Sequence, residues 1–274
     1  MSLPVDQKTA DAFAESWNHL PEGSVYTHAQ ALDWFEPLTP ADFSGKDVLE
    51  LGCGNASLLY HVMSWNPAHA VGVDLGSSVR SAEKNLGLQS YKNWKIIQGD
   101  LTTYRGSTQY DIVYCIGVLH HLKQPYKGFE SLVENTKSGG KFHAWVYAHE
   151  GNWVIRNILD PIRFVASRLP WWFTKHVLAT VLVFPYYLYA KILNCVPRWK
   201  SLKALPLYEY ALWIAQREFA FFRHVAFDQL VTPQTAYIKK SDIEAWFEKR
   251  QDIKDTYIIM RNGNSWKFGG TKQL

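Results

Sequence analysis

The chain has 274 residues, of which 47% are hydrophobic and 20% are charged, and its formal net charge is +4. The apolar fraction excludes a disordered chain, and the length predicts one large core with an insertion or lid. Three scattered cysteines, none in a C-x-x-C pair, exclude a disulfide framework and a cysteine-based zinc site. The polar, acidic N-terminus is unlike a secretory signal, so we expect a cytoplasmic protein.

The first half of the chain alternates short apolar runs with helix-like stretches, after one or two expected helices at 10–17 and 29–35. This alternation is typical of βα units on a parallel sheet. The expected strands are Asp47–Leu51, 69–73, Trp94–Gln98, 110–115 and 141–147. The expected helices between them are 57–65, 77–88 and 124–136, and Gly139 and Gly140 are expected to turn the chain into the fifth strand.

Beyond residue 233 the pattern returns, with an expected helix over Lys240–Glu248, a strand over 253–260 and a turn over 261–265. The whole pattern predicts an α/β fold: a Rossmann-like, doubly wound, mostly parallel seven-stranded sheet with an inserted aromatic-rich helical lid. We expect four parts. They are an N-terminal helical cover (1–44), a Rossmann-like core (45–150), a helical lid or substrate insertion (151–232), and a C-terminal helix and strands that complete the sheet (233–274).

The insertion is rich in basic and aromatic residues. Residues 151–203 contain eight Lys or Arg and one acidic residue, and residues 151–230 contain 17 of the 41 aromatic residues. Within the insertion, residues 177–196 carry one charge, Lys191, and a central Pro185. Three interpretations of this stretch stay open: a buried pair of lid helices, which we favour, shallow contact with a membrane surface, and a membrane span.

The clearest motif is VLELGCGNASLL, over residues 48–59. Gly52 and Gly54 let the backbone turn tightly after a strand and approach a ligand. The helix that starts near Asn55 or Ala56 points its N–H groups at that ligand. Such a turn suits a nucleotide-like ligand, and the glycine spacing alone fits both a dinucleotide and S-adenosylmethionine.

Acidic residues near three strand ends favour S-adenosylmethionine. Asp74 is placed to accept hydrogen bonds from both ribose hydroxyl groups, and Asp100 is placed to accept one from the adenine amino group. Glu50 is placed to hold the ammonium group of the methionine part through the loop. A cationic sulfonium ligand suits three carboxylates, whereas a pyrophosphate would be repelled by them.

Five segments together resemble the class I S-adenosylmethionine-dependent methyltransferases, in the small-molecule branch whose fourth-strand motif ends in LHH. These segments are ELGCGNA (50–56), VGVDLG (71–76), QGDL (98–101), YDIVYCIGVLHHL (110–122) and SGGKFHAWVY (138–147). Ala56 replaces the third glycine of the family, and we interpret it as tolerated because alanine is a small residue that starts helices. The resemblance implies S-adenosyl-L-methionine as the cofactor. The cofactor-binding residues that it implies are Trp17, Tyr26, Glu50, Gly52, Cys53, Gly54, Asn55, Asp74, Leu75, Asp100, Leu101, Ile116 and Gly117.

The resemblance also implies a place for the apolar members of this set. Leu75 and Leu101 are expected to sandwich the adenine ring, and residues 116–117 are expected to pass beside the methionine part. Trp17 and Tyr26 are expected to close the cofactor from outside.

Methyl transfer from a sulfonium is an in-line displacement that needs alignment of the acceptor and, for a hydroxyl or an amine, a base. His120 is the first candidate for a catalytic residue, because it follows the fourth strand at the sheet edge where ligands bind. His149, beyond the fifth strand, and His224, one helical turn before Asp228, are further candidates. For all three, an ordinary structural role is the alternative. No third ligand accompanies His224 and Asp228, so we expect no metal.

The aromatic insertion predicts a dry pocket, and therefore a small, hydrophobic or aromatic metabolite as the methyl acceptor. The alternatives are an RNA (tRNA or rRNA) methyltransferase that uses the basic segment 151–203, and a non-catalytic partner protein that binds S-adenosylmethionine. Nucleic acid is disfavoured because the basic residues show no cluster. Peripheral membrane contact through residues 171–200 and the oligomeric state stay open.

Overall fold

The computed structural model describes residues 5–17, 24–153, 155–196, 200–205, 207–232 and 235–273. Its internal contacts separate two compact units. The core unit comprises Met1–Tyr147, Gln234–Ile259 and Trp266–Leu274, and the helical unit comprises Ala148–Pro233 with Met260–Ser265. Each unit has a buried apolar cluster of its own.

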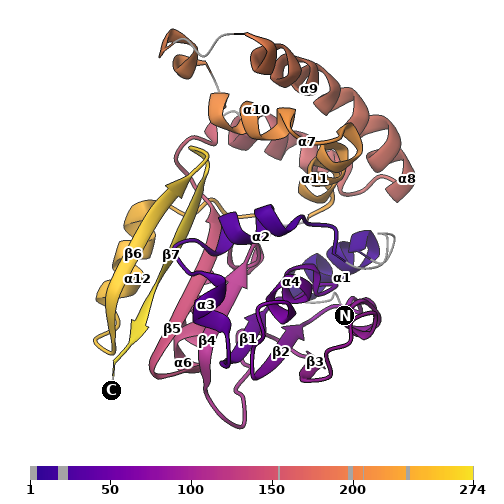
Figure 1. The fold of residues 1–274 in the computed structure, drawn as a ribbon. Helices are drawn as coiled ribbons and strands as arrows, with labels where there is room; N and C mark the ends of the chain where they lie inside the picture. The colour runs from indigo at the N-terminus through magenta and orange to yellow at the C-terminus, as the bar shows by residue number, and fades with distance from the viewer. Residues whose placement is uncertain are drawn as a thin grey trace. The chain divides into compact units, whose positions relative to one another are not determined.

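The core unit is built on one seven-stranded sheet with the strand order β3-β2-β1-β4-β5-β7-β6 (Figure 1). The strands are β1 (Asp47–Leu51), β2 (His69–Asp74), β3 (Trp94–Gln98), β4 (Tyr110–Ile116), β5 (Thr136–Tyr147), β6 (Ile253–Arg261) and β7 (Ser265–Lys272). Strands β1 to β5 pair in parallel, whereas β6 and β7 form an antiparallel hairpin. The strand order reverses between β1 and β4, which places a ligand at the carboxyl ends of these strands. The predicted Rossmann-like, mostly parallel fold is confirmed.

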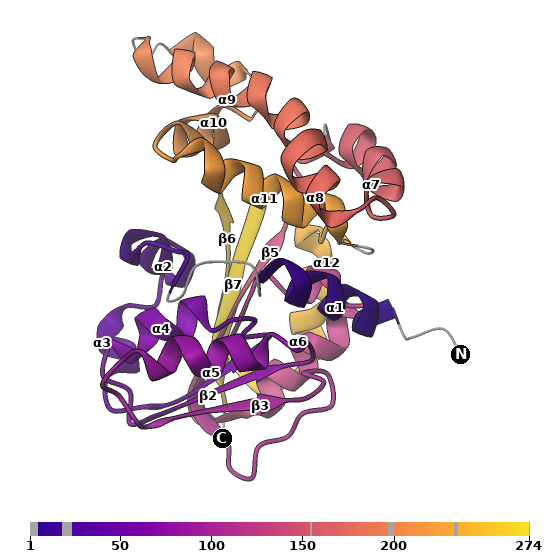
Figure 2. The same ribbon diagram turned by 90° about the vertical axis from the view of Figure 1, so that its right-hand side faces the viewer.

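Helices cover both faces of this sheet, and its central strands are therefore apolar on both sides. One face packs against α2, α4 and α5 through a cluster that includes Phe35, Leu59 and Leu86. The other face packs against α6 and α12, where the rings of Phe129 and Trp246 stack 5.7 Å apart (Figure 2). The helices of the core unit are α1 (Val5–Trp17), α2 (His28–Phe35), α3 (Pro40–Phe43), α4 (Ser57–Met63), α5 (Val79–Gly87), η1 (Leu119–His121), α6 (Pro125–Glu134) and α12 (Lys240–Glu248).

The helical unit is built around one long helix, α9, which packs against α10 and α11 (Figure 2). Val183 of α9, Ile214 of α10 and Phe222 of α11 are buried at this contact. The helical stretch Thr174–Cys195 is, by length and composition alone, apolar enough to cross a membrane. The segments of this unit are η2 (Ile155–Leu159), α7 (Asp160–Ala166), α8 (Trp171–Phe173), η3 (Thr174–Leu178), α9 (Ala179–Cys195), η4 (Lys200–Ala204), α10 (Tyr208–Ala215) and α11 (Phe219–Val231).

The boundary between the third predicted helix and the fifth strand differs from expectation. The helix α6 ends at Glu134, and β5 begins at Thr136, which pairs with Tyr110 of β4. A register shift between Tyr110 and Ile112 lets the strand include the glycine pair that we expected to form a turn. Residues 137–140 lie between the paired Thr136 and Lys141, and Gly139 has a φ of +77°, so the glycine pair turns the backbone within an irregularity of β5 and not before it.

The favoured interpretation of residues 177–196, a buried pair of lid helices, is wrong. Pro185 lies inside α9 without ending it, so the stretch forms one helix. A proline lacks the N–H that would donate a helical hydrogen bond, but α9 continues beyond Pro185 to Cys195. Only 22% of the most apolar part of Thr174–Cys195 is buried, so most of this helix is not core.

Candidate functional site

The glycine turn between β1 and α4 has a backbone that glycine adopts without strain. Gly52 has a φ of +80° and Gly54 a φ of +52°, both in the left-handed region. The N–H groups of Gly52 and Cys53 donate to the Val73 carbonyl oxygen at 2.7 and 3.0 Å, which ties the turn to the end of β2. A Cβ atom on Gly52 would lie 2.5 Å from Cγ2 of Val118, so the turn has no room for a side chain there.

Ala56 lies in the left-handed region as well, with a φ of +61°. It is the N-cap residue of α4, and the helix begins one residue later, at Ser57. Ala56 therefore lies at the helix start, as expected, and its carbonyl oxygen accepts from the N–H of Tyr60 at 2.8 Å, but its left-handed conformation costs an L-residue about 1–2 kcal/mol. Its methyl group is fully buried in the core cluster, and burial of one such group offsets roughly 0.8 kcal/mol of that strain.

The carboxylate of Asp74 holds the turn from the end of β2. Its Oδ2 accepts from the N–H of Gly54 at 2.9 Å, and its Oδ1 accepts from the N–H of Gly76 at 2.9 Å and from the hydroxyl of Ser78 at 3.1 Å. Burial raises the pKa of Asp74, and the three hydrogen bonds act in the opposite direction. A carboxylate has about four acceptor positions, so one remains on Oδ2 for a ribose hydroxyl group.

Asp100, after β3, keeps a carboxylate oxygen for a ligand. Its Oδ1 accepts from the N–H and the hydroxyl of Thr102, at 2.8 and 2.7 Å, in a local turn. Among the residues that the structure describes, Oδ2 has no donor. Leu101 is buried and Leu75 is half-buried, and they follow the same two strand ends. This arrangement provides an acceptor and apolar neighbours of the kind that an adenine ring requires.

Glu50 is only 2% exposed, on the sheet face that packs against α4. The hydroxyl of Tyr114, its partner across β1 and β4, donates to Oε2 at 3.1 Å. Burial raises the pKa of Glu50 well above its ordinary value, and the nearby charge of Asp74 raises it further. A cation beside such a carboxylate favours its charged form. No sequence motif points to Tyr114, whose contact with Glu50 follows from the pairing of β1 with β4.

Two further predicted residues lie at the start of α4. Asn55 is buried, and its Oδ1 accepts from the N–H and the hydroxyl of Ser57 at 3.2 and 2.7 Å. The hydroxyl of Ser24 donates to the Ser57 carbonyl oxygen at 2.7 Å, which holds the segment that contains Tyr26 against this helix start. Tyr26 therefore lies near the turn, and its contact with a cofactor stays a prediction. Trp17 ends α1, and its side chain lies outside the described residues.

The remaining predicted residues lie at the ends of β1 and β4. Ile116 is nearly buried, and Gly117 has a φ of +80° and donates its N–H to the Trp145 carbonyl oxygen at 3.0 Å. Burial raises the pKa of the Cys53 thiol well above its ordinary value, so this cysteine stays protonated. A protonated, buried thiol lines the turn but does not act as a nucleophile.

His120 is fully buried in an aromatic cluster that follows β4. The centre of its ring lies 4.1 Å from that of Tyr147, 4.2 Å from that of His121 and 6.0 Å from that of Trp145. The hydroxyl of Thr235 lies 3.1 Å from Nδ1 of His121. The structure thus places His120 in the core unit, on the strand end predicted for it, with aromatic rings around its imidazole.

His149 and His224 belong to the helical unit, where His149 follows β5 and His224 lies on α11. Both side chains are half-buried, and the side chain of Asp228 lies outside the described residues. Their catalytic roles stay predictions. In the described part of the chain, no group of three or more His, Cys, Asp or Glu side chains is arranged to hold a metal ion.

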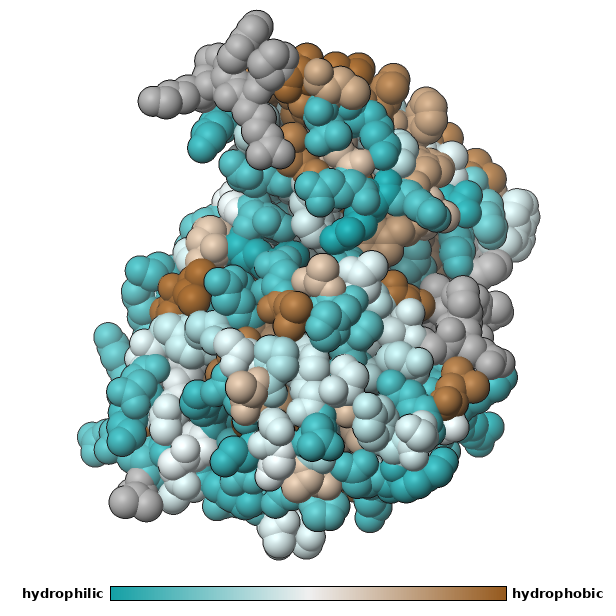
Figure 3. Space-filling model, viewed as in Figure 1, coloured by the Kyte–Doolittle hydropathy of each residue, from teal (hydrophilic) through white to brown (hydrophobic). Residues whose placement is uncertain are grey.

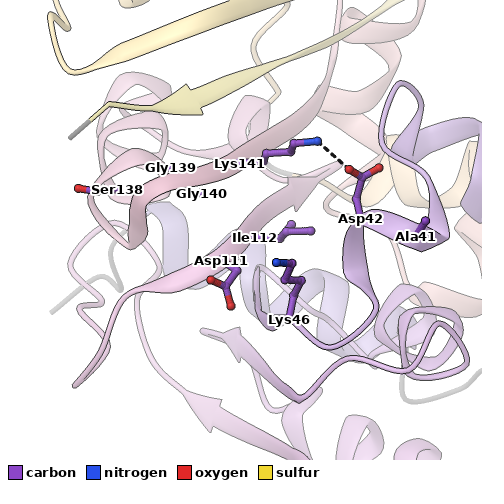
Figure 4. A pocket seen from close by; sticks show the side chains of 9 residues that line it. All are labelled: Ala41, Asp42, Lys46, Asp111, Ile112, Ser138, Gly139, Gly140 and Lys141. Atoms are coloured by element: carbon purple, nitrogen blue, oxygen red, sulfur yellow. Dashed lines mark hydrogen bonds and ion pairs between the residues drawn. The ribbon is translucent and has the colours of Figure 1, made fainter.

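A cavity of about 400 Å³ lies at the opposite edge of the sheet, beside the start of β4 and the glycine pair of β5 (Figure 4). Lys46 and Asp111 line it, and Nζ of Lys141 donates to Oδ1 of Asp42 at 2.6 Å. None of the predicted site residues lines this cavity, so it is separate from the glycine turn.

Known proteins resemble parts of this chain in sequence. Residues 42–154 match a family described as a methyltransferase domain. The ubiquinone biosynthesis O-methyltransferase of Paraburkholderia phytofirmans is 28% identical over 144 residues, which cover 51% of this chain and 59% of that protein. The tRNA U34 carboxymethyltransferase of Helicobacter acinonychis is 28% identical over 115 residues, 40% of this chain and 44% of that protein. The chain spans less than two thirds of these relatives.

A solved structure resembles the whole fold. It is the magnesium protoporphyrin IX methyltransferase of Synechocystis with bound S-adenosylmethionine, which has a TM-score of 0.54 and 13% identity over 99% of both chains. At this identity the likeness concerns the fold.

The fold, the glycine turn and the acidic strand ends define the class I S-adenosylmethionine-dependent methyltransferases, which confirms the family resemblance. Residues 42–154 match the methyltransferase domain family. Its cofactor, S-adenosylmethionine, fits the residues present: Gly52 leaves the turn open, Asp100 keeps an acceptor oxygen, and Glu50 is a buried carboxyl group that a cation would ionise. That the LHH motif marks a small-molecule branch stays a prediction.

Proposed function

We propose that this chain transfers the methyl group of S-adenosylmethionine to a small, hydrophobic or aromatic acceptor, and that the helical unit provides the acceptor's binding surface. The observation that supports this acceptor is the apolar and aromatic interior of the helical unit. There the ring of Tyr186 lies 6.1 Å from that of Tyr210 and 5.7 Å from that of Phe222. Binding sites for small apolar molecules are lined by side chains of this kind.

The chain's own residues bind and orient in this reaction. When bound, S-adenosylmethionine supplies a methyl group on a positively charged sulfur, which leaves as a neutral thioether when the acceptor attacks the methyl carbon. Asp74 and Asp100 would hold the nucleoside, while the carboxylate of Glu50 would balance the positive charge of the ammonium group on the methionine part. Alignment of two reactants alone reaches effective molarities of about 10⁵–10⁸ M. The protein therefore needs few groups besides those that position the two molecules and take the acceptor's proton.

We propose His120 as the residue that takes this proton or positions the residue that does. Replacement of His120 by alanine is expected to lower kcat by about 10²-fold, the scale of general-base catalysis, with the affinity for S-adenosylmethionine changed less than threefold. The measurement is a pH profile of kcat together with calorimetric cofactor binding. An unchanged kcat per folded molecule, with a lowered Tm, would show that His120 only packs against Tyr147.

The second candidate function is methylation of tRNA or rRNA, because one relative is a tRNA U34 carboxymethyltransferase. The arrangement of the basic side chains argues against it. The Nζ of Lys191 donates to the Ala215 carbonyl oxygen at 2.7 Å, and Arg163 is only 6% exposed. Arg217 lies over the Trp213 ring, 5.3 Å from its centre. Arg163, Lys191 and Arg217 are therefore poorly placed to follow an RNA backbone, which requires a row of exposed basic groups.

Cofactor binding is tested by replacing Asp74 with asparagine. The variant loses the negative charge and places an amide N–H₂ toward N–H donors, so we expect the affinity for S-adenosylmethionine to fall by about 100-fold in calorimetry. The matched control is Asp111→Asn, because Asp111 lies at the opposite edge of the sheet and pairs with Lys137 at 3.2 Å. Equal affinities of the two variants, or preferential binding of a dinucleotide, would overturn the assignment.

The acceptor is tested with a labelled methyl donor. We expect label in a lipophilic metabolite extract from the cytoplasm, where the free Cys53, Cys115 and Cys195 suit a reducing environment. Label in purified RNA, with binding that falls steeply as salt rises, would favour the second candidate. Cofactor binding without transfer to either fraction would favour a non-catalytic partner protein.

A further inference from the structure

The helix α9 and the turn before it expose a continuous apolar stripe to solvent. The stripe side chains recur every three or four residues, the spacing of one helix face. They are Val177 (40% exposed), Val181 (66%), Phe184 (54%), Leu188 (52%) and Ile192 (56%). Brown, apolar side chains gather over α9 at the top of Figure 3. Exposed apolar patches of this extent mark sites of interaction with a partner or a membrane.

The opposite face of α9 is packed against protein. Val183, Ala190 and Leu193 are buried against α10 and α11, and Nζ of Lys191 is held by the Ala215 carbonyl oxygen. A single helix that spans a bilayer is surrounded by lipid on all sides. If α9 spanned a membrane in this way, it would lose its contacts with α10 and α11. A helix with one face on protein and one apolar face exposed is suited to lie in the plane of a membrane surface. The helix is therefore long enough to span a membrane but is packed as an interfacial helix.

Other side chains of the helical unit extend this apolar surface. Aromatic residues among them are typical of membrane interfaces, because their rings are amphipathic or large and flat. The exposed members near α7 and α8 are Ile158 (50%), Phe164 (67%), Val165 (58%) and Trp172 (58%).

The charge of this region selects the kind of membrane. Residues 151–203 carry eight Lys or Arg and one acidic residue; Arg163 and the Nζ of Lys191 face the unit's interior, whereas Arg168 and Lys203 are exposed and supply positive charge at the surface. A positive surface is attracted to anionic lipid headgroups. The same charge opposes a second copy of the chain as the occupant, because two such faces would repel each other.

We propose that the apolar stripe of α9 and the surrounding positive charge dock the protein peripherally on an anionic membrane surface. The proposal concerns the helical unit alone and does not depend on the cofactor site. Loss of docking and loss of S-adenosylmethionine binding are therefore separate results.

The experiment is co-flotation of the full chain with vesicles of phosphatidylcholine alone and of phosphatidylcholine with phosphatidylglycerol in equal parts. We expect binding to the anionic vesicles that weakens as salt rises. The double variant Phe184→Glu and Leu188→Glu is expected to lower the partition coefficient by at least about tenfold. The matched control is Leu88→Glu in the core unit, because Leu88 is 55% exposed and lies outside the stripe.

A second variant tests the charge without touching the stripe. Arg168→Glu with Lys203→Glu is expected to remove most of the preference for anionic over neutral vesicles. Calorimetric binding of S-adenosylmethionine by each variant verifies that it is folded. The proposal is overturned if the natural chain fails to float with anionic vesicles, or if the stripe variant floats as well as the control. A dimer in sedimentation that the stripe variant dissociates, without vesicle binding, would assign the stripe to a second copy instead.

Discussion

Replacement of Gly52 by alanine is expected to abolish measurable binding of S-adenosylmethionine and to lower the free energy of unfolding by about 2–5 kcal/mol. The left-handed φ of +80° costs an alanine about 1–2 kcal/mol. The added Cβ meets Cγ2 of Val118 at 2.5 Å and Cγ1 at 2.8 Å, and such overpacking costs typically about 1–3 kcal/mol more. Because the turn approaches the cofactor, its displacement also changes the binding surface. Calorimetry and urea unfolding measure the two effects.

The control separates backbone strain from steric collision. Gly45 has a φ of +70°, and no heavy atom lies within 4 Å of a Cβ built on it. Gly45→Ala should therefore lose about 1 kcal/mol of stability and keep its cofactor affinity. Adding Val118→Ala to Gly52→Ala removes both colliding methyl groups, and we expect part of the stability to return. If the Gly52→Ala variant binds S-adenosylmethionine with the same affinity as the Gly45→Ala variant, the glycine turn is not part of the cofactor-binding site.

The sequence predicted the cofactor end of the sheet well because its determinants are local. An apolar run predicts a buried strand, and the residue that follows a parallel strand lies at the ligand edge whatever the rest of the chain does. Asp74 and Asp100 were placed on that basis, and the structure shows their carboxylates beside the turns that end β2 and β3.

Other features depend on contacts that a linear pattern lacks. The left-handed φ of Ala56 depends on the turn around it, and no pattern in the sequence indicates it. The pairing of Tyr114 with Glu50 requires knowledge that β1 and β4 are neighbours. For α9, the hydropathy of the sequence indicates that the helix is apolar, but it does not indicate which face packs against protein. The exposed stripe follows only from the packing of Val183 and Leu193 on the other side.

Replacement of Glu50 by glutamine is expected to stabilise the protein and weaken cofactor binding. Because burial raises the pKa of Glu50 above its ordinary value of 4.5, the folded chain retains a proton that the unfolded chain releases. The natural chain therefore loses stability as pH rises above about 4.5, up to the raised pKa, whereas the glutamine variant does not. The difference in unfolding free energy between the two should be small below that pH and grow by up to about 1.4 kcal/mol per pH unit above it. Urea unfolding at pH 5 and pH 8 measures it.

The same variant lacks the charge that a cationic cofactor would stabilise, so we expect its affinity for S-adenosylmethionine to fall by about tenfold. Glu244→Gln is the control, because Glu244 is exposed on α12 and its ion pair with Lys240 contributes little. A stability difference that is equal at both pH values would show that the Glu50 carboxyl is not the titrating group. An unchanged affinity would show that it only supports Tyr114. A variant that is more stable but binds S-adenosylmethionine more weakly is the expected result, because burial of the Glu50 carboxyl serves cofactor binding and lowers the stability of the fold.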